Sequence, residues 1–161
     1  MNNGGAIMNG TCFFVGHRDA PQSLKRRLGD VIEYVIQKYG IGQFFVGSHG
    51  DFDRLATSAV IYLKNRYPDI KLWILLPYYH ADKAIELPEG VDGTYYPEGI
   101  EFVPPKFAII KANQKMVREC DVLISYAKYA GNAQKLTQYA DHRGVRVINL
   151  AEQLIAWEEE K

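Results

Sequence analysis

Residues 11–18, with the sequence TCFFVGHR, decide the fold of this 161-residue chain. A short run of β-branched and aromatic residues that ends at a glycine is typical of a buried strand followed by a tight turn. Similar apolar runs recur at residues 43–47 (QFFVG), 70–76 (IKLWILL), 121–126 (DVLISY) and 145–149 (VRVIN). Because these runs are apolar on both faces, they predict a parallel sheet that is covered by helices on each side.

Segments of helical periodicity lie between the predicted strands. After Pro21, apolar residues recur every three or four positions until Gly40, so we expect a helix over 21–39. A second helix is predicted to carry its apolar face at residues 55–63 and to end before Pro68, and further helices are predicted over 106–120, 133–142 and 151–157. Strands that alternate with helices through right-handed crossovers predict an α/β fold. We expect a three-layer, Rossmann-like, doubly wound parallel sheet of about five main strands in the order 3-2-1-4-5, with helices on both faces.

The composition is that of an ordinary globular chain. Hydrophobic residues make up 47% of it and charged residues 24%, which excludes disorder for most of its length. We expect a flexible, Asn- and Gly-rich leader over 1–10, a single domain over 11–157 and a solvated tail over 158–161. Because Cys12 and Cys120 are the only cysteines, a disulfide framework is excluded and both are expected to be buried free thiols.

The charge balance limits the classes of partner. The chain contains nineteen Lys and Arg residues and nineteen Asp and Glu residues, which gives a formal net charge of zero. General binding to nucleic-acid backbones is therefore not expected. No apolar run approaches the ~18 residues that span a bilayer, and the first ten residues lack the features of a signal peptide. The sequence therefore predicts a cytoplasmic protein without membrane contact, and it still leaves room for a local basic pocket.

Three loops carry the candidate chemistry. In an open parallel sheet, ligands bind at the carboxyl ends of the strands, where the strand order reverses. The loops expected there are rich in glycine and polar residues: 16–19 (GHRD), 47–53 (GSHGDFD) and 130–133 (AGNA). Two of them place glycines directly before a helix, where free N–H groups and the helix dipole favour an anion. Arg18 adds a cation suited to forked contacts with phosphate or carboxylate.

Each of these residues also has a structural interpretation. The glycines are consistent with simple turns, and Asp51 and Asp53 stand where helix N-caps belong. His17 and His49 fit structural or surface roles as well as catalysis. The ligand hypothesis therefore depends on the convergence of three separate loops at one edge. Neither a GxGxxG fingerprint nor a GxxxxGK[ST] loop occurs, so a standard dinucleotide dehydrogenase and a P-loop NTPase are not expected.

A primary amide interrupts the apolar stripe predicted for the helix over 106–120. Asn113 stands within this stripe, which consists of Ile109, Ile110, Met116 and Val117. An unpaired amide there would cost about 1–3 kcal/mol, so Asn113 either bonds a nearby backbone group or contacts a ligand. The tyrosines at 78, 79, 95 and 96 leave a similar choice between a platform that stacks a base and the packing of a long surface excursion.

Residues 11–18, residues 47–53, and the segment NQKM at 113–116 ahead of residues 121–124 together resemble the SLOG superfamily. This group of Rossmann-like proteins includes the DNA-processing protein DprA (Smf) and the plant LOG enzymes. The chain is most similar to its small stand-alone bacterial branch, the YpsA-like proteins, over about residues 11–150. The resemblance implies a Rossmann-like fold and a pocket for a nucleotide or nucleotide-derived ligand, in a protein that senses or signals rather than catalyses.

The resemblance also implies positions in this pocket. It places Gly16 and Arg18 on the phosphate side of the pocket. A second wall would consist of Gly47, Gly50 and Asp53, and a third of Gly131 and Asn132. LOG enzymes remove a base from a nucleoside monophosphate with a PGGxGTxxE segment whose glutamate carries the hydrolysis. Here Gln138 stands at the place of that glutamate. Since an amide cannot exchange a proton as a carboxylate does, LOG-type activity is not expected.

The sequence therefore predicts a protein that binds a nucleotide-derived ligand, with a sensing or signalling role and no strong catalysis. The expected ligand contacts are Gly16, His17, Arg18, Gly47, Ser48, Gly50, Asp53, Asn113, Gly131 and Asn132. No metal ion or other cofactor is required, the expected partner is a phosphorylated small molecule, and a homodimer is compatible with such a fold. Two alternatives stay open. One is a hydrolase of nucleoside monophosphates or ADP-ribose with His17 or Asp53 as acid or base, and the other is a protein-interaction scaffold.

Overall fold

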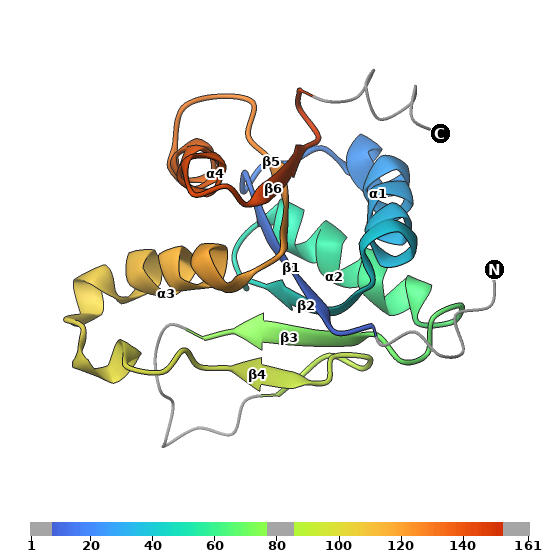
Figure 1. Ribbon diagram of the computed structural model, residues 1–161, viewed down its shortest axis with the longest axis horizontal. Helices are drawn as coiled ribbons and strands as arrows, with labels where there is room; N and C mark the ends of the chain where they lie inside the picture. Colours follow the sequence, from blue (N-terminus) through green and yellow to red (C-terminus); the bar gives the residue numbers. More distant parts are fainter. Residues whose placement is uncertain (1–7, 77–85, 153–161) are drawn as a thin grey trace.

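The computed structural model describes residues 8–76 and 86–152, which form a single six-stranded sheet with helices on both faces (Figure 1). The strands lie in the order β4-β3-β2-β1-β5-β6, and every neighbouring pair is parallel. In chain order they are β1 (Gly10–Gly16), β2 (Ile41–Val46), β3 (Lys71–Leu75), β4 (Gly93–Tyr95), β5 (Val122–Tyr126) and β6 (Arg146–Asn149). The five predicted main strands are β1, β2, β3, β5 and β6, and their predicted order is confirmed.

Strand β4 is an addition to the predicted sheet. It lies at the edge beside β3, where residues 93–95 pair with residues 73–75. Its sequence, Gly-Thr-Tyr, contains no apolar run, so the pattern that predicts the other strands does not reveal it. Asp92 fixes its start, because its carboxylate accepts a hydrogen bond from the N–H of Leu72 at 2.8 Å and pairs with Lys64.

Four α-helices and two 3₁₀ turns connect the described strands. They are η1 (Gln22–Leu24), α1 (Lys25–Tyr39), α2 (Asp51–Leu63), η2 (Ile100–Phe102), α3 (Pro105–Glu119) and α4 (Asn132–His142). The predicted helices are confirmed in this part of the chain. The N-cap residue of α2 is Gly50, so Asp51 and Asp53, which were predicted at N-cap positions, lie in its first turn instead. Most of the helix predicted over 151–157 falls outside the described residues, and the two that are described form a turn.

The sheet separates two apolar cores. Alternation along β1 turns Phe14 toward the core under α1 and α2, and turns Phe13 toward the core under α3 and α4. Both rings are 1% exposed, and burial of each side chain contributes about 1.5–3 kcal/mol. Helices therefore cover both faces, which confirms the three-layer, Rossmann-like arrangement (Figure 1).

The start of the sheet reaches into the predicted leader. β1 begins at Gly10, whose N–H donates to the carbonyl of Gly40 at 3.1 Å. Gly40 ends α1 with a φ of 66°, a conformation that glycine adopts without strain. Met8 packs against the core on the α1 side. The first seven residues fall outside the described part of the chain.

Both cysteines are buried free thiols, as predicted. Burial raises the pKa of Cys120 to about 12 and raises the pKa of Cys12 well above its usual value. Both thiols are therefore protonated at neutral pH and act as packing groups. Across the described residues, no helix has both the length and the apolar character needed to cross a membrane.

The buried stripe of α3 differs from the prediction. It is formed by Ala108, Ala112, Met116 and Val117, whereas Ile109 and Ile110 are 40% and 50% exposed. The four-residue spacing of the two alanines and the methionine turns a narrow, mostly small face toward the sheet, so the bulkier isoleucines point away from this core. Half of the predicted stripe is therefore wrong, and α3 presents apolar side chains outside the core.

Candidate functional site

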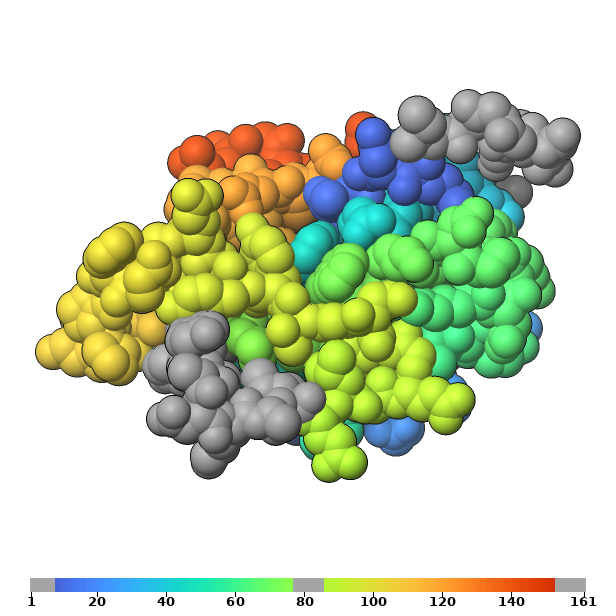
Figure 2. Space-filling view, turned by 90° about the horizontal axis from the view of Figure 1, so that it is seen from below, coloured from blue at the N-terminus to red at the C-terminus, as the bar shows by residue number. Residues whose placement is uncertain are grey.

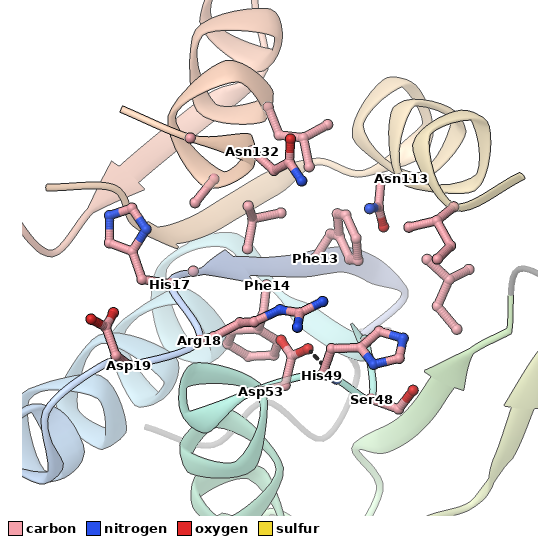
Figure 3. Close-up of a pocket in the computed structure, with 18 of the residues that line it drawn as sticks. Phe13, Phe14, His17, Arg18, Asp19, Ser48, His49, Asp53, Asn113 and Asn132 are labelled. Carbon is pink, nitrogen blue, oxygen red and sulfur yellow. Dashed lines mark hydrogen bonds between the residues drawn. The ribbon is translucent and has the colours of Figure 1, made fainter. Parts of the chain in front are cut away.

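A cavity of about 560 Å³ opens at the carboxyl ends of the central strands, where the predicted topology places a ligand. The loops after β1, β2 and β5 meet there with helices α3 and α4 (Figure 3). Nine of the ten predicted ligand contacts line it: Gly16, His17, Arg18, Gly47, Ser48, Asp53, Asn113, Gly131 and Asn132. Three loops that are far apart in the sequence therefore share one cavity.

The tenth residue, Gly50, does not line the cavity, and it allows two loops to approach each other. Its φ is 93°, and a Cβ atom at this position would lie 2.6 Å from the Cα of Arg18. The neighbouring N–H of Asp51 donates to the carbonyl of Arg18 at 2.8 Å. Gly50 thus holds the start of α2 against the loop after β1, and this contact positions Arg18.

Two further glycines bring α2 close to the strand ends. A Cβ atom on Gly16 would lie 2.2 Å from the ring of Phe52, and one on Gly47 would lie 2.9 Å from Oδ2 of Asp53. Phe52 is fully buried, so its ring has no room to retreat. Both glycines therefore serve close packing in addition to lining the cavity.

His17 connects the loop after β1 with the loop after β5. Its Nε2 accepts hydrogen bonds from the N–H groups of Lys128 and Tyr129, at 2.9 and 3.3 Å. Burial lowers the pKa of His17, although Asp19 opposes the effect, so the ring is neutral at pH 7. Because its Nε2 lone pair is already engaged, the geometry favours the structural interpretation of this histidine.

Tyr129 is a member of the cavity that sequence reasoning missed. Its ring stacks on His17 with centroids 3.7 Å apart and planes 5° from parallel, and its hydroxyl donates to Asp19. The Tyr129 side chain is 48% exposed and lines the cavity. The available signal was its place two residues before Gly131, in a loop that already carried candidate residues.

Arg18 supplies the cavity with a cation. It is the only Lys or Arg among the described residues that line the cavity. Its side chain is exposed and points into the cavity between Phe13 and Asp53 (Figure 3). Within the described part of the chain, no hydrogen bond or ion pair engages its guanidinium. This group is therefore available to a ligand.

Asp53 adds to the cavity a carboxyl group that is a weaker acid than usual. Burial raises the pKa of Asp53 to about 7, although a hydrogen bond from the N–H of His49 at 3.0 Å and the charge of Arg54 act in the opposite direction. The carboxyl therefore exists in both protonation states near neutral pH. In the neutral form it can donate as well as accept a hydrogen bond.

The N-terminus of α4 adds main-chain donors. Gly131 is its N-cap residue, no side chain caps the helix, and its first turn contains no acidic residue. Gly131 and Asn132 both line the cavity. The first N–H groups of a helix have no partner within it and carry part of the helix dipole, so this end of the cavity favours an anion.

Helices α3 and α4, together with residues of strands β1 and β3, give the cavity an apolar wall. Its members are Phe13, Leu75, Ile109, Ala112, Ala133 and Leu136. Half-buried Asn113 interrupts this wall, and its amide forms no hydrogen bond with another described residue. Of the two predicted roles for Asn113, the bond to a nearby backbone group is therefore not observed. The wall presents a single amide within an apolar surface.

The four tyrosines at 78, 79, 95 and 96 were predicted either to stack a base or to pack a surface segment. Tyr95 and Tyr96 pack against the core under α3, and the ring of Tyr95 meets Phe45 edge-on with centroids 5.3 Å apart. The packing interpretation is therefore confirmed for these two. Tyr78 and Tyr79 lie outside the described residues. The aromatic ring that does line the cavity, beside Phe13 and Phe14, is that of Tyr129.

No known family model matches the chain, and no curated protein matches it in sequence. Within residues 8–76 and 86–152, no group of three or more His, Cys, Asp or Glu side chains could hold a metal ion. Fold and cavity together define the class: a Rossmann-like α/β protein with a cleft at the carboxyl edge of a parallel sheet. Among the residues that the structure describes, the cleft combines one cation without a partner, one carboxyl of raised pKa, main-chain donors and an apolar wall.

Proposed function

We propose that the protein binds a nucleotide, or a phosphorylated ligand derived from one, and senses or signals its presence. One observation carries the proposal: a guanidinium that no described residue engages and a helix N-terminus with no acidic residue in its first turn border the same cavity. Arg18 supplies the guanidinium, and Gly131 and Asn132 place the N-terminus of α4 at the cavity. Forked guanidinium donors and the free N–H groups of a helix N-terminus are both established ways in which proteins hold phosphate.

The remaining lining suits the rest of such a ligand. A volume of about 560 Å³ lies within the usual range for small-molecule sites. The apolar wall fits a planar ring, and the free amide of Asn113 offers one donor and one acceptor to its edge. Asp53 faces the cavity and is suited to the hydroxyl groups of a ribose. Phosphate, sugar and base would then each meet a group of matching chemistry.

The resemblance to the SLOG superfamily supports the same class of ligand. The residues that carry it, in the loops after β1 and β2, are among those that border the cavity. The LOG-type hydrolytic glutamate is replaced by Gln138, and this replacement favours binding over turnover. We therefore expect a ligand that is retained rather than consumed.

Thermal unfolding with a panel of nucleoside mono- and diphosphates and ADP-ribose tests this proposal. At least one compound should raise the Tm, because a ligand that binds only the folded state stabilises it. Arg18→Ala should abolish the shift and leave the Tm without ligand unchanged, since an exposed side chain without a partner contributes little to folding.

Arg54→Ala is the matched control for this experiment. Arg54 is also exposed, with a side chain 73% accessible, but it pairs with Asp51 on α2 and does not line the cavity. This variant should keep the full shift. A panel that shifts nothing, or an undiminished shift in Arg18→Ala, would contradict the proposal.

A hydrolase is a second candidate because of Asp53. A carboxyl with a pKa of about 7 can act as acid or base at neutral pH, as hydrolysis of an N-glycosidic bond requires. Incubation with nucleoside monophosphates and ADP-ribose, followed by chromatography for released base, tests this role. Turnover that disappears in Asp53→Asn while binding persists would assign it, whereas wild-type protein that releases no base excludes it for these substrates.

A further inference from the structure

A short exposed loop, residues 128–131, leads from β5 to the first turn of α4. It ends at Gly131, which lines the cavity together with Asn132. Among the described residues, every hydrogen bond that residues 128–130 form goes to the loop after β1. In Figure 2 the blue atoms of the loop after β1 lie beside the orange atoms that follow β5. The loop that presents the N-terminus of α4 is therefore held from one side.

His17 makes most of these contacts, and it uses a single nitrogen atom for two of them. Its Nε2 accepts the N–H groups of both Lys128 and Tyr129. The imidazole also stacks on the ring of Tyr129, whose hydroxyl donates to Asp19. His17 is 7% exposed, whereas residues 128–131 are all exposed. A buried ring thus anchors an exposed loop.

This anchor requires a neutral imidazole. The lone pair on Nε2 accepts N–H groups, but a protonated Nε2 is itself a donor. Three N–H groups would then point at one another, and the N–H groups of Lys128 and Tyr129 would lose their acceptor. An unpaired donor costs free energy that contact with water recovers. Protonation of His17 therefore favours movement of the loop away from the ring.

The groups around the ring keep it neutral at pH 7. Burial lowers the pKa of His17, and the carboxylate of Asp19 in the same loop opposes the effect. From β5, Tyr126 meets the ring edge-on with centroids 5.6 Å apart. The loop after β5 contributes Tyr129 and the backbone of Lys128, whose side chain is exposed. Only a pH below the neutral range charges the ring.

We propose that His17 is the positioning residue of the anion site and that its protonation releases the loop that carries the N-terminus of α4. While His17 is neutral, the α4 N-terminus and Arg18 border one cavity. After release, the helix N–H groups and the guanidinium no longer meet the same anion. The release of the loop stands on its own contacts, and its effect on a ligand rests on the proposed function. A phosphorylated ligand would then dissociate as the pH falls.

NMR titration of the backbone amides from pH 8 to pH 4.5 tests the loop without a ligand. The N–H signals of Lys128 and Tyr129 should shift together with the ring of His17, with a midpoint below its ordinary pKa of 6.5. The heteronuclear NOE of residues 128–131 should fall below this midpoint, because the loop gains freedom.

Two glutamine variants make this titration specific. In His17→Gln the side-chain oxygen lies as many bonds from the Cα as Nε2 does, and it accepts hydrogen bonds at every pH in this range. The variant should hold the loop and abolish the shift of the two amides. His142→Gln, at the exposed end of α4, is the matched control and should titrate as the wild type does.

Sulfate binding tests the consequence for the site. Sulfate keeps its charge over this pH range, whereas a phosphate monoester gains a proton near about pH 6. The amide shifts of Gly131 and Asn132 report binding. Below the midpoint, the dissociation constant of the wild type should exceed that of His17→Gln by roughly ten-fold, as expected when one donor group leaves the site. Asp53, with a pKa of about 7, is present in both proteins, so its protonation cancels in the comparison.

The outcomes separate this inference from the proposed function. Amides of Lys128 and Tyr129 that do not titrate, or that titrate equally in His17→Gln, overturn the inference alone. Sulfate that binds the wild type more tightly than His17→Gln in acid also overturns it, because His17 would then act as a cationic ligand. A loop that responds as expected, in a protein that binds neither sulfate nor any nucleotide of the panel, overturns the proposed function and with it the role of His17 at an anion site.

Discussion

Helices α2 and α4 both begin at a glycine beside the same cavity, yet their N-termini are satisfied in different ways. At α2, the first turn holds Asp51 and Asp53, and the backbone at Gly50 is in contact with the loop after β1. Neither helix has a side-chain cap, but the N–H of Asp51 on α2 donates to the carbonyl of Arg18. The first turn of α4 holds no acidic residue, and a Cβ atom on Gly131 would meet no described atom within 4 Å. The N-terminus of α2 is therefore occupied by groups of the protein itself, whereas the N-terminus of α4 is open to the cavity.

This difference shows that two similar glycine loops have different tasks. Carboxylates in the first turn of α2 interact favourably with its dipole, so an incoming phosphate would meet negative charge there. The corresponding end of α4 keeps its N–H groups available. We infer that α2 assembles the cavity by positioning Arg18 and Asp53, and that α4 receives the anion.

Alanine at the two N-cap glycines should break this comparison most strongly. Gly50→Ala combines a φ of 93° with a Cβ that would lie 2.6 Å from the Cα of Arg18, so we expect a loss of roughly 2–6 kcal/mol in the free energy of unfolding. Gly131→Ala has open space around it and a φ of 154°, so the expected loss is about 1 kcal/mol. Urea denaturation measures both, and equal losses would contradict the assigned roles.

Asp53→Asn should sharpen the comparison, because it should change how the free energy of unfolding depends on pH. The folded-state pKa of Asp53 is about 7, against 3.8 in the unfolded chain, so between these values only the unfolded state ionises and the stability of the wild type falls as pH rises. Asparagine cannot ionise. The variant should therefore match the wild type near pH 4 and be more stable by about 2–4 kcal/mol at pH 8. Denaturation curves at the two pH values test this, and a difference that does not change with pH would refute the raised pKa.

The smallest effect is expected when α4 is made to resemble α2. Asn132→Asp places a carboxylate in the first turn of α4, which should stabilise the protein by about 0.5 kcal/mol through the helix dipole. The same charge should diminish the Tm shift that a phosphorylated ligand produces. His142→Glu, which adds a carboxylate in the last turn of α4, is the control and should leave that shift intact. An unchanged shift in Asn132→Asp would place the phosphate elsewhere.

The main strands could be predicted because each contains an apolar run, as in residues 11–15 and 121–126. Their order followed from right-handed crossovers in a doubly wound sheet. β4 could not be predicted, since three residues at an edge leave no pattern. The stripe of α3 was half wrong for a related reason. Hydrophobicity alone favoured Ile109 and Ile110, whereas the close approach of helix and sheet selected Ala108 and Ala112.

The candidate site divides in the same way. Nine of the ten predicted contacts line the cavity, because glycine and polar residues at strand ends converge on one edge of a parallel sheet whatever the details of packing. Gly50 falls outside because its φ and its contact with Arg18 are properties of the folded loop pair. Tyr129 enters because stacking on His17 brings it there, and no spacing in the sequence encodes that contact.

By itself, the sequence determined the alternation of strands and helices, the edge at which polar loops gather, and the chemical types that those loops carry. These are consequences of local periodicity and of topology, which short stretches of chain already contain. Only the tertiary structure decided which helix N-terminus stays open, which guanidinium lacks a partner among the described residues, and how far the pKa of Asp53 is raised. Those properties depend on distances and burial between segments remote in the chain, since hydrogen bonds, packing and desolvation act through space.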